Sequence, residues 1–559
     1  MDFIFSRDPS HVDQLKILLR PLADKYPAKS VFAFTGDWGC LVSTGSHYKA
    51  FDPGMFYDHV IVVSGDPLIA SDDPNRTASI GRCLKNTEPL RPQHPASILS
   101  VNTLSGTMKV TTDAWGAVPV YMVADWPDIL VGSSPDLLAL AHPCSIDALS
   151  ACEKLCANQI SYPNTLYQQI KEMPPGTDTK FKLANAEPIE NRWWHAPLPS
   201  TDIPRDDWYQ TLNADIADTL NQLYNQVGPK GSITLSSGLD SRYLLDMACK
   251  NTGFDLAAVN IAACKNISSR TASQVAARYQ VPFSMVARRT DHYAAVALSD
   301  PPEIGSNTCL TDAHFADRAL DDLPNDEFLI GGYMADTIII GGDPFTKGRE
   351  RAIARKEIPQ DAPRWAANAL YLRFDAETRA QITARWDAAD CLLGLTPAHS
   401  RMMSRIYPAN RQGHKGHFDT ARRNYPIYEP FMTPSALSLG FRLPDDIKST
   451  QGLKSSFYGQ HLALTSDIPV NVAASRAYRQ MIRLVKAVMP KRLLPLSLTH
   501  SGEWQAVSGP LAPQHRQAIL RSSAILEKEL GIILAGCRGE RHGTTVMQIA
   551  AALARCETT

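Results

Sequence analysis

The chain has 559 residues, 44% of them hydrophobic and 20% charged, so it is long enough for at least two domains and unlike a disordered protein. Lys and Arg total 56 against 57 Asp and Glu, and the net charge of -1 excludes recognition of nucleic acid or an anionic membrane by an overall positive field. The 11 Cys lack the paired spacing of a zinc site, and no signal peptide or apolar run of about 18 residues occurs. We therefore expect a cytoplasmic protein with reduced thiols, and no nucleic acid or membrane among its partners.

Residues 1 to about 195 consist of short β-type segments separated by turn residues. The segments 31–34, 60–63 and 118–123 are rich in β-branched and aromatic side chains, which predicts strands. A stretch with several Pro, 197–204, follows them, and a helix is predicted after it from Asp206 to about Gln226. We expect two domains, residues 1–197 and 205–559.

After residue 228 the pattern changes to strands that alternate with helices. Strands are predicted at 232–235, 256–261 and 283–287, with amphipathic helices between them. Repeated βαβ units of this kind predict a parallel sheet, whose ligands bind at the carboxyl ends of its strands. Beyond about residue 345 the pattern is mainly helical, so the second domain is expected to be α/β with a helical C-terminal extension.

The turn Ser236–Ser241, with the sequence Ser-Ser-Gly-Leu-Asp-Ser, joins the first of these strands to its helix. Small residues allow backbone N–H groups to point, with the helix N-terminus, at an anion such as phosphate. The serine hydroxyls add donors, whereas Asp240 would repel a phosphate unless a divalent cation bridges the two. The same residues also fit a plain structural turn.

This strand, turn and helix resemble the pyrophosphate loop of the ATP pyrophosphatase class, and their surroundings resemble the asparagine synthetase family. In the loop, Ser237 replaces the usual first Gly. The segment 328–337, followed by Gly341-Gly342, is similar to a second motif of that family, although Thr337 replaces its usual Glu. The resemblance implies that Asp240 and Asp336 bind Mg²⁺; for Asp336, a helix or turn cap is the alternative. It further implies that ATP is bound by Ser236, Ser237, Gly238, Leu239, Asp240, Ser241, Val259, Asn260 and Gly332.

Two later segments extend the resemblance. The segment from Tyr428 to Leu443-Pro444 is similar to another family segment, with Met432-Thr433 in place of its Leu-Asp pair. Lys454 falls where the family has a Lys that approaches the phosphates, so it would stabilise charge in the transition state; an exposed Lys without a role is equally compatible. In β-lactam synthetase-like relatives a Tyr and a Glu act as general base, which makes Tyr425, Tyr428 and Glu429 further catalytic candidates.

The first domain resembles the N-terminal nucleophile glutaminase domain of the same family, through the segments 112–121, 131–134 and 166–176. Those enzymes expose a nucleophilic Cys at position 2, whereas this chain has Asp2 there and its first thiol at Cys40. A carboxylate cannot replace the thiol in that chemistry. The resemblance therefore implies an α+β N-terminal nucleophile-like sandwich domain without glutaminase activity, followed by an α/β ATP pyrophosphatase domain.

From the resemblance we expect an ATP- and Mg²⁺-dependent ligase that forms an amide bond through an acyl-adenylate. The expected substrate is a peptide closed into a macrolactam, as in lasso-peptide cyclases, or a small carboxylate and amine, and a precursor-processing protease is an expected partner. Two alternatives stay open. One is an ammonia-dependent asparagine synthetase, and the other is a degenerate homologue that serves as a non-catalytic scaffold subunit.

One more group of polar residues has a spacing that is found in metal sites. His414, His417 and Asp419 lie within six residues of one another, but Gly413 and Gly416 stand beside the two histidines. Glycines at these positions favour a loop. We expect a solvated loop here rather than a metal site.

Overall fold

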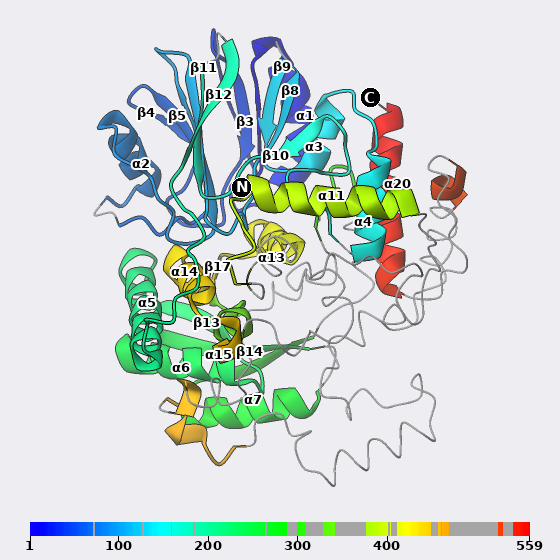
Figure 1. The fold of residues 1–559 in the computed structure, drawn as a ribbon. Coiled ribbons are helices and arrows are strands. Elements are labelled where there is room, and N and C mark those ends of the chain that lie inside the picture. Colours follow the sequence, from blue (N-terminus) through cyan, green and yellow to red (C-terminus); the bar gives the residue numbers. More distant parts are fainter. Residues whose placement is uncertain are drawn as a thin grey trace.

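The structure is a computed structural model in which antiparallel sheets occupy one side of the molecule and a parallel sheet the other (Figure 1). It describes residues 1–70, 73–125, 128–157, 159–182, 185–262, 265–287, 299–303, 305–308, 328–340, 376–400, 403, 411–448, 457–459, 461–468, 524–528 and 540–558. The chain is thus an α+β protein with both kinds of sheet. In the described ranges, no helix is long and apolar enough to cross a membrane.

Two six-stranded antiparallel sheets form the N-terminal part. One has the strand order β10-β8-β9-β1-β3-β2; its strands are β1 (Phe3–Ser6), β2 (Val31–Gly36), β3 (Gly39–Thr44), β8 (Tyr121–Asp125), β9 (Asp128–Gly132) and β10 (Ile170–Glu172). The other has the order β12-β11-β7-β6-β5-β4; its strands are β4 (Gly54–Phe56), β5 (His59–Gly65), β6 (Ala96–Asn102), β7 (Thr107–Thr112), β11 (Thr177–Lys182) and β12 (Asn185–Arg192).

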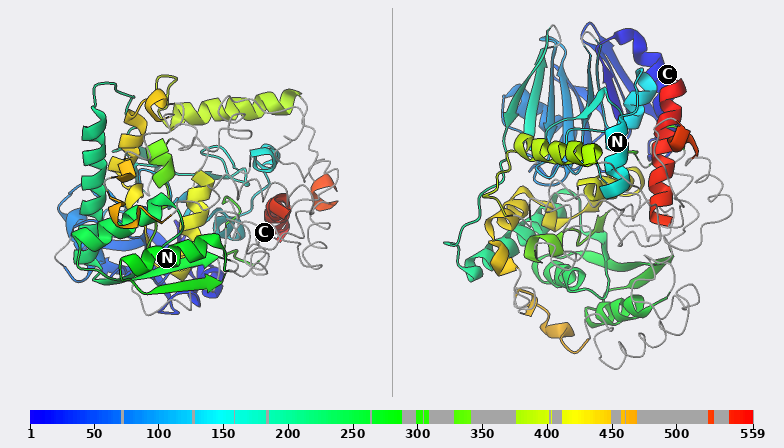
Figure 2. Two further views of the ribbon diagram at one scale, coloured as in Figure 1. Left: turned by 90° about the horizontal axis from the view of Figure 1, so that it is seen from below. Right: turned by 45° about the vertical axis from the view of Figure 1, so that its right-hand side comes forward.

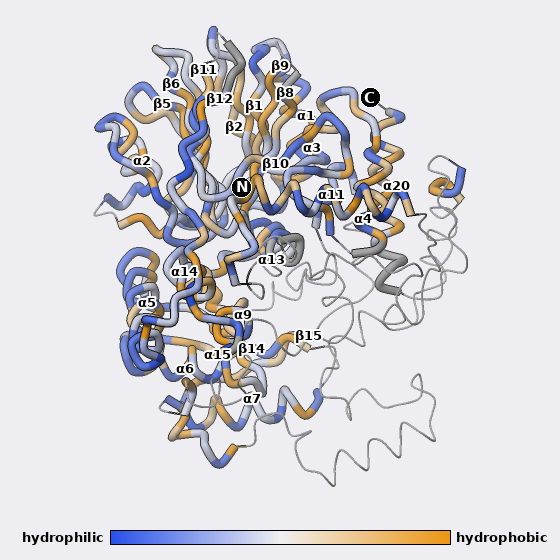
Figure 3. Tube along the Cα trace, in the orientation of Figure 1, coloured by the Kyte–Doolittle hydropathy of each residue, from blue (hydrophilic) through white to orange (hydrophobic). Residues whose placement is uncertain are grey.

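The two sheets pack face to face around a shared apolar layer that includes Phe5, Leu41, Val62, Leu99 and Phe181. The predicted strands at 31–34 and 60–63 are confirmed as β2 and β5. The strand predicted from residue 118 begins only at Tyr121, because Pro119 has no N–H to donate to a sheet ladder. Figure 3 shows the apolar stretches that run along these strands.

Helices cover the sandwich. The helices α1 (Val12–Ala23), α3 (Pro135–Ala141), α4 (Ala148–Ala157) and α20 (Glu540–Thr558) contribute to one apolar cluster with β1, β3 and β8, and α2 (Arg76–Lys85) packs on β4 and β5. Although α20 lies at the end of the predicted second domain, it packs on α3 and α4 (Figure 2). The C-terminal segment therefore returns to the antiparallel part.

The parallel sheet has the order β15-β14-β13-β16-β17, with strands β13 (Lys230–Thr234), β14 (Asp255–Ala262), β15 (Phe283–Ala287), β16 (Leu329–Ile330) and β17 (Ile427–Tyr428). Its helices are α5 (Arg205–Gln226), α6 (Leu239–Asn251), α7 (Ile267–Arg278), α9 (Ala335–Ile340), α14 (Pro434–Arg442) and α15 (Asp445–Lys448). The three predicted strands, their parallel pairing and the helix predicted after Asp206 are confirmed. Sequence patterns did not predict the two-residue strand β17, because it is too short for a periodicity.

Two further helices, α11 (Ala376–Leu392) and α13 (Arg411–Asn424), belong to the part predicted to be helical. The loop predicted around Gly413 and Gly416 is wrong, because both residues lie within α13. Glycine costs a helix about 1 kcal/mol, and buried contacts of the neighbouring side chains outweigh this preference. Figure 1 shows α13 between the antiparallel sheets and the parallel sheet.

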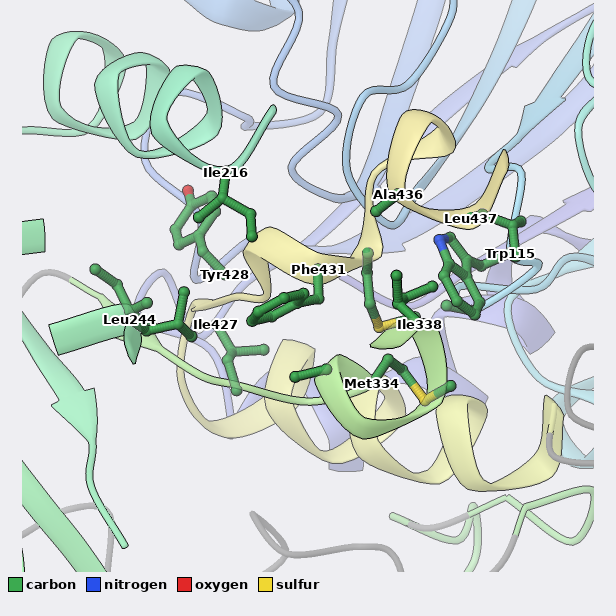
Figure 4. Packing of buried hydrophobic residues seen from close by; sticks show 14 of the residues in the cluster. Trp115, Ile216, Leu244, Met334, Ile338, Ile427, Tyr428, Phe431, Ala436 and Leu437 are labelled. Atoms are coloured by element: carbon green, nitrogen blue, oxygen red, sulfur yellow. The ribbon is translucent and has the colours of Figure 1, made fainter. Parts of the chain in front are cut away.

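One apolar cluster joins the two parts of the molecule (Figure 4). Trp115, from the antiparallel part, is buried with Ile338 and Leu437, and its indole Nε1 donates to the Thr433 carbonyl oxygen over 3.2 Å. Because the cluster is continuous, separation of the two parts would expose apolar surface on both.

A buried ion cluster centred on Asp2 strengthens this junction. The Asp2 carboxylate, which has no solvent exposure, accepts Arg423 Nη2 at 2.6 Å and Arg423 Nε at 2.9 Å. Arg422 Nη2 lies 3.2 Å from the same carboxylate, and the hydroxyls of Tyr26 and Ser133 donate to it. Burial alone would raise the pKa of Asp2, but the Arg423 and Arg422 guanidinium groups lower it well below its usual range. Asp2, the residue before β1, thereby holds α13 through its ion pairs with Arg422 and Arg423.

We predict that Asp2→Asn lowers stability by about 3–5 kcal/mol at neutral pH, because it removes the carboxylate that pairs with the buried Arg423 guanidinium and leaves Arg422 with Asp419 as its carboxylate partner. The pKa of Asp2 is lower in the folded chain than in the unfolded chain, where it is about 4. The ionised carboxylate therefore stabilises the fold above about pH 4, and this stabilisation is lost as the pH falls toward the pKa of the folded chain. The difference between the variant and the parent should therefore shrink below about pH 4. Chemical denaturation of both proteins at several pH values measures this difference in the free energy of unfolding. The control is Asp13→Asn, whose partner Lys16 and own carboxylate are exposed; equal losses in both variants would contradict the assignment.

Candidate functional site

The loop Ser236–Ser241 lies between the carboxyl end of β13 and the start of α6, in the middle of the parallel sheet. Its serines organise its backbone. Ser236 N donates to Ser241 Oγ over 3.0 Å, and Gly238 N donates to Ser236 Oγ over 3.0 Å. Leu239, partly buried against the core, begins α6. The loop therefore presents hydroxyls and a helix N-terminus at the sheet edge where ligands of parallel sheets bind.

Ser237 is the residue at which this loop departs from the expected glycine, and the structure accommodates its side chain inside the protein. Ser237 is 1% exposed, while Ser236 is exposed. Ser237 N donates to Ser268 Oγ on α7 over 3.1 Å, and Arg242 Nη2 donates to the Ser237 carbonyl oxygen over 3.1 Å. The backbone of Ser237 thus ties the loop to α7 and α6.

A second loop follows β16 and lies against the first. A Cβ added to Gly332 would lie 3.7 Å from the Ser241 amide nitrogen and 3.8 Å from the Asp240 carbonyl carbon. The two loops are therefore near enough for ordinary van der Waals contact at this position. Their approach brings together the Ser236–Ser241 motif and the segment that carries Asp336.

The phenol of Tyr458 contacts Asp240 and lies within electrostatic range of Asp336. Tyr458 is buried and its hydroxyl donates to Asp240 Oδ1. Burial, and then the nearby carboxylates of Asp240 and Asp336, raise the pKa of Tyr458 well above its usual value. Two carboxylates near one point fit Mg²⁺, which is usually held by one or two carboxylates with waters and substrate phosphates. In the described part of the chain, no group of three or more His, Cys, Asp or Glu could hold a metal by itself.

Val259 and Asn260, the other predicted ligand contacts, lie on β14 beside the loop. The Val259 carbonyl oxygen accepts from Leu235 N over 2.8 Å, and Asn260 Nδ2 donates to the Leu235 carbonyl oxygen over 2.6 Å. Asn260 is 5% exposed, and its Oδ1 finds no hydrogen-bond partner among the described residues. Both residues therefore hold the strand end from which the loop begins.

Glu429 is a buried carboxylate at the same edge of the sheet, and it is 1% exposed. Its Oε2 accepts from Tyr333 N over 2.7 Å, and its Oε1 lies 2.7 Å from His417 Nε2. A Cβ on Gly331 would lie 2.1 Å from Glu429 Oε1, so this carboxylate requires glycine there. The His417 ring stacks on Tyr333, with 4.3 Å between centroids and 8° between planes. Glu429, Tyr333 and His417 form one packed group.

The structure directs the predicted Tyr428 away from the Glu429 carboxylate. Tyr428 is buried and its hydroxyl donates to Asp66 Oδ2 over 2.6 Å, on the antiparallel side of the molecule. Neighbouring residues of extended backbone point to opposite sides, which places Tyr428 and Glu429 in different surroundings. Tyr425 packs partly buried against the core. The tyrosine that lies beside Glu429 is Tyr333.

Sequence reasoning missed Tyr333, His417's contact with Glu429, and Tyr458. Tyr333 lies in the segment 328–337, three residues before Asp336, but only the fold brings it to Glu429. The glycines beside His417 predict a loop, which gives no sign of its contact with Glu429. Lys454, the predicted catalytic Lys, lies outside the described residues, so its role stays a prediction.

Comparisons with known proteins give little support for a relationship. No family model matches the chain, and no curated protein matches it. Two solved structures, the allosteric regulatory enzyme of purine biosynthesis and the glutamine phosphoribosylpyrophosphate amidotransferase from B. subtilis complexed with ADP and GMP, are each 9% identical. Each alignment covers 51% of this chain. It covers 80% of the first structure, with a TM-score of 0.22, and 84% of the second, with a TM-score of 0.19. Such low scores support no statement about this chain.

The surroundings of residue 2 generate a prediction about glutamine. We expect that Asp2→Cys does not release ammonia from glutamine, because the Arg422 and Arg423 side chains and the Tyr26 hydroxyl fill the space around residue 2. Glutamate formation from glutamine, followed by a coupled dehydrogenase assay, measures this. Circular dichroism and thermal unfolding report whether the variant is folded. Glutamine turnover by the folded variant would contradict this expectation, because it would show that glutamine reaches residue 2.

Proposed function

We propose that the chain is an ATP- and Mg²⁺-dependent ligase that forms an amide bond through an acyl-adenylate. The observation that carries the proposal is the arrangement around the Ser236–Ser241 loop, where Gly332 lies against Ser241, Asp240 accepts from the Tyr458 hydroxyl, and the Asp336 carboxylate helps to raise the pKa of that phenol. This arrangement supports a site for pyrophosphate oxygens and a cation at the carboxyl end of a central parallel strand.

In the proposed reaction a substrate carboxylate oxygen attacks the α-phosphorus of ATP, and pyrophosphate leaves. The loop hydroxyls of Ser236 and Ser241 and the N-terminus of α6 would bind the departing phosphates. Asp240 and Asp336 would hold the magnesium ion, which neutralises phosphate charge when it is bound. Lys454, on the segment before Tyr458, would add a positive charge at the reacting centre.

The second proposed step is attack of an amine nitrogen on the acyl carbon, with departure of AMP and loss of one proton from nitrogen. Glu429 is the proposed acceptor of that proton, since its carboxylate lies at the same sheet edge as the loop. Tyr333 takes the place of Tyr428 in the proposed tyrosine and glutamate pair, because its backbone N–H contacts Glu429 and its ring covers His417.

The amine is proposed to come from the substrate rather than from glutamine. Asp2 supplies no nucleophile, and the arginines of α13 occupy its surroundings. A peptide that carries both the carboxylate and the amine, with closure to a macrolactam, is the proposed substrate class. A precursor-processing protease is the partner that such a substrate would require.

We predict that Asp240→Asn and Asp336→Asn each weaken Mg²⁺-dependent binding of pyrophosphate by more than about tenfold, because each removes a direct cation ligand. Titration calorimetry with pyrophosphate, with and without Mg²⁺, measures this without knowledge of the substrate. The control Asp467→Asn changes an exposed carboxylate paired with Arg278 and should bind like the parent. Unchanged binding in both site variants would refute the proposed metal site.

The activity itself is tested by exchange of labelled pyrophosphate into ATP with candidate carboxylates, followed by detection of AMP and amide product. The competing function is a non-catalytic subunit, favoured by the serine hydroxyls that already engage the N–H groups of Ser236, Ser237 and Gly238. A chain that binds neither pyrophosphate nor ATP in the presence of Mg²⁺ would support that function. Formation of asparagine from aspartate and ammonium would instead indicate an ammonia-dependent asparagine synthetase.

A further inference from the structure

Two thiols from opposite ends of the sequence lie together at the edge of the antiparallel part. Cys144 stands in the segment between α3 and α4, and Cys556 is in the last turn of α20. Their sulfur atoms are 3.7 Å apart and 412 residues apart in sequence. Both residues are partly exposed, so a small oxidant in solution can reach this pair.

The backbone around this thiol pair is held in place by polar contacts on the same helix. Arg555, next to Cys556, contacts Asp136 Oδ1 at 3.1 Å and Asp300 Oδ1 at 2.7 Å. One turn or more earlier, Gln548 Nε2 donates to the Gly305 carbonyl oxygen over 3.1 Å. These contacts bind α20 to α3 and to the segment 299–308. The thiols therefore meet at a junction of three parts of the chain.

We propose that Cys144 and Cys556 are a site of reversible disulfide formation that fastens α20 covalently to the antiparallel part. A disulfide requires sulfur atoms about 2.05 Å apart, so the two side chains must approach from their present contact. Rotation about the Cα–Cβ bonds supplies such a movement in partly exposed residues. The proposal is independent of the proposed ligase function.

The chemistry is thiol-disulfide exchange with a small disulfide such as oxidised glutathione. The Cys556 thiolate attacks one sulfur of the oxidant, which gives a mixed disulfide and one glutathione thiolate. Cys144 then attacks the Cys556 sulfur and releases the second glutathione; the two cysteines lose two electrons and the oxidant gains them. The hydrogen bond from Cys144 lowers the pKa of Cys556, which favours Cys556 as the first nucleophile.

The closing of so long a loop restricts the unfolded chain and should stabilise the fold. We expect that incubation of the full chain in oxidised glutathione gives a linked pair of peptides containing Cys144 and Cys556, and raises the thermal midpoint by several degrees. Excess dithiothreitol should reverse both changes. Mass spectrometry of non-reduced digests and thermal unfolding measure them.

Matched variants distinguish this site from general oxidation. Cys144→Ser and Cys556→Ser should each abolish the linked peptides and the rise in thermal midpoint, while Cys391→Ser, at an exposed thiol, should retain both. Serine is nearly isosteric with cysteine, so the reduced variants should unfold near the parent's midpoint. The proposal is overturned if the two thiols stay unlinked in the oxidised parent, or if linkage joins either of them to another cysteine instead.

Discussion

The ion cluster between Asp2 and the arginines of α13 is the interaction on which the arrangement of the molecule depends. Buried charges are costly unless each is paired and hydrogen-bonded, and here one carboxylate receives Arg423, Arg422 and two hydroxyls. The cluster has one favourable geometry, so it fixes α13 against the antiparallel sandwich. Because α13 also faces the parallel sheet, the placement of α13 determines where its side chains meet the candidate site.

A short series of contacts connects α13 to the candidate site. α13 carries His417, His417 contacts Glu429, and Glu429 accepts from Tyr333 N. Tyr333 follows Gly332, which lies against the first turn of α6 and the Ser236–Ser241 loop. The antiparallel part thus supports the candidate site mechanically, even though its residue 2 has no nucleophile. A buried pair between Lys415 of α13 and Glu172 of β10 adds a second anchor.

The near-zero net charge is compatible with an anionic ligand, because charge in this protein acts over short distances. Ion pairs such as Arg76 with Asp66 and Arg555 with Asp136 are buried at junctions between elements, where the dielectric is low and screening is weak. In the proposed ligase, phosphate charge would be met by one helix N-terminus, one cation and Lys454. No general positive surface is required for such recognition.

Local patterns in the sequence predicted the strands β13, β14 and β15 with the helices between them, the loop between β13 and α6, and the lack of a thiol at position 2. These follow from periodicity, turn chemistry and residue identity, which act over a few neighbours. The fold places Gly413 and Gly416 in a helix, brings Tyr333 rather than Tyr428 beside Glu429, and packs α20 on the antiparallel part. Each of these depends on contacts between residues distant in sequence, whose burial and pairing energies outweigh local preference and leave no periodic pattern in the chain.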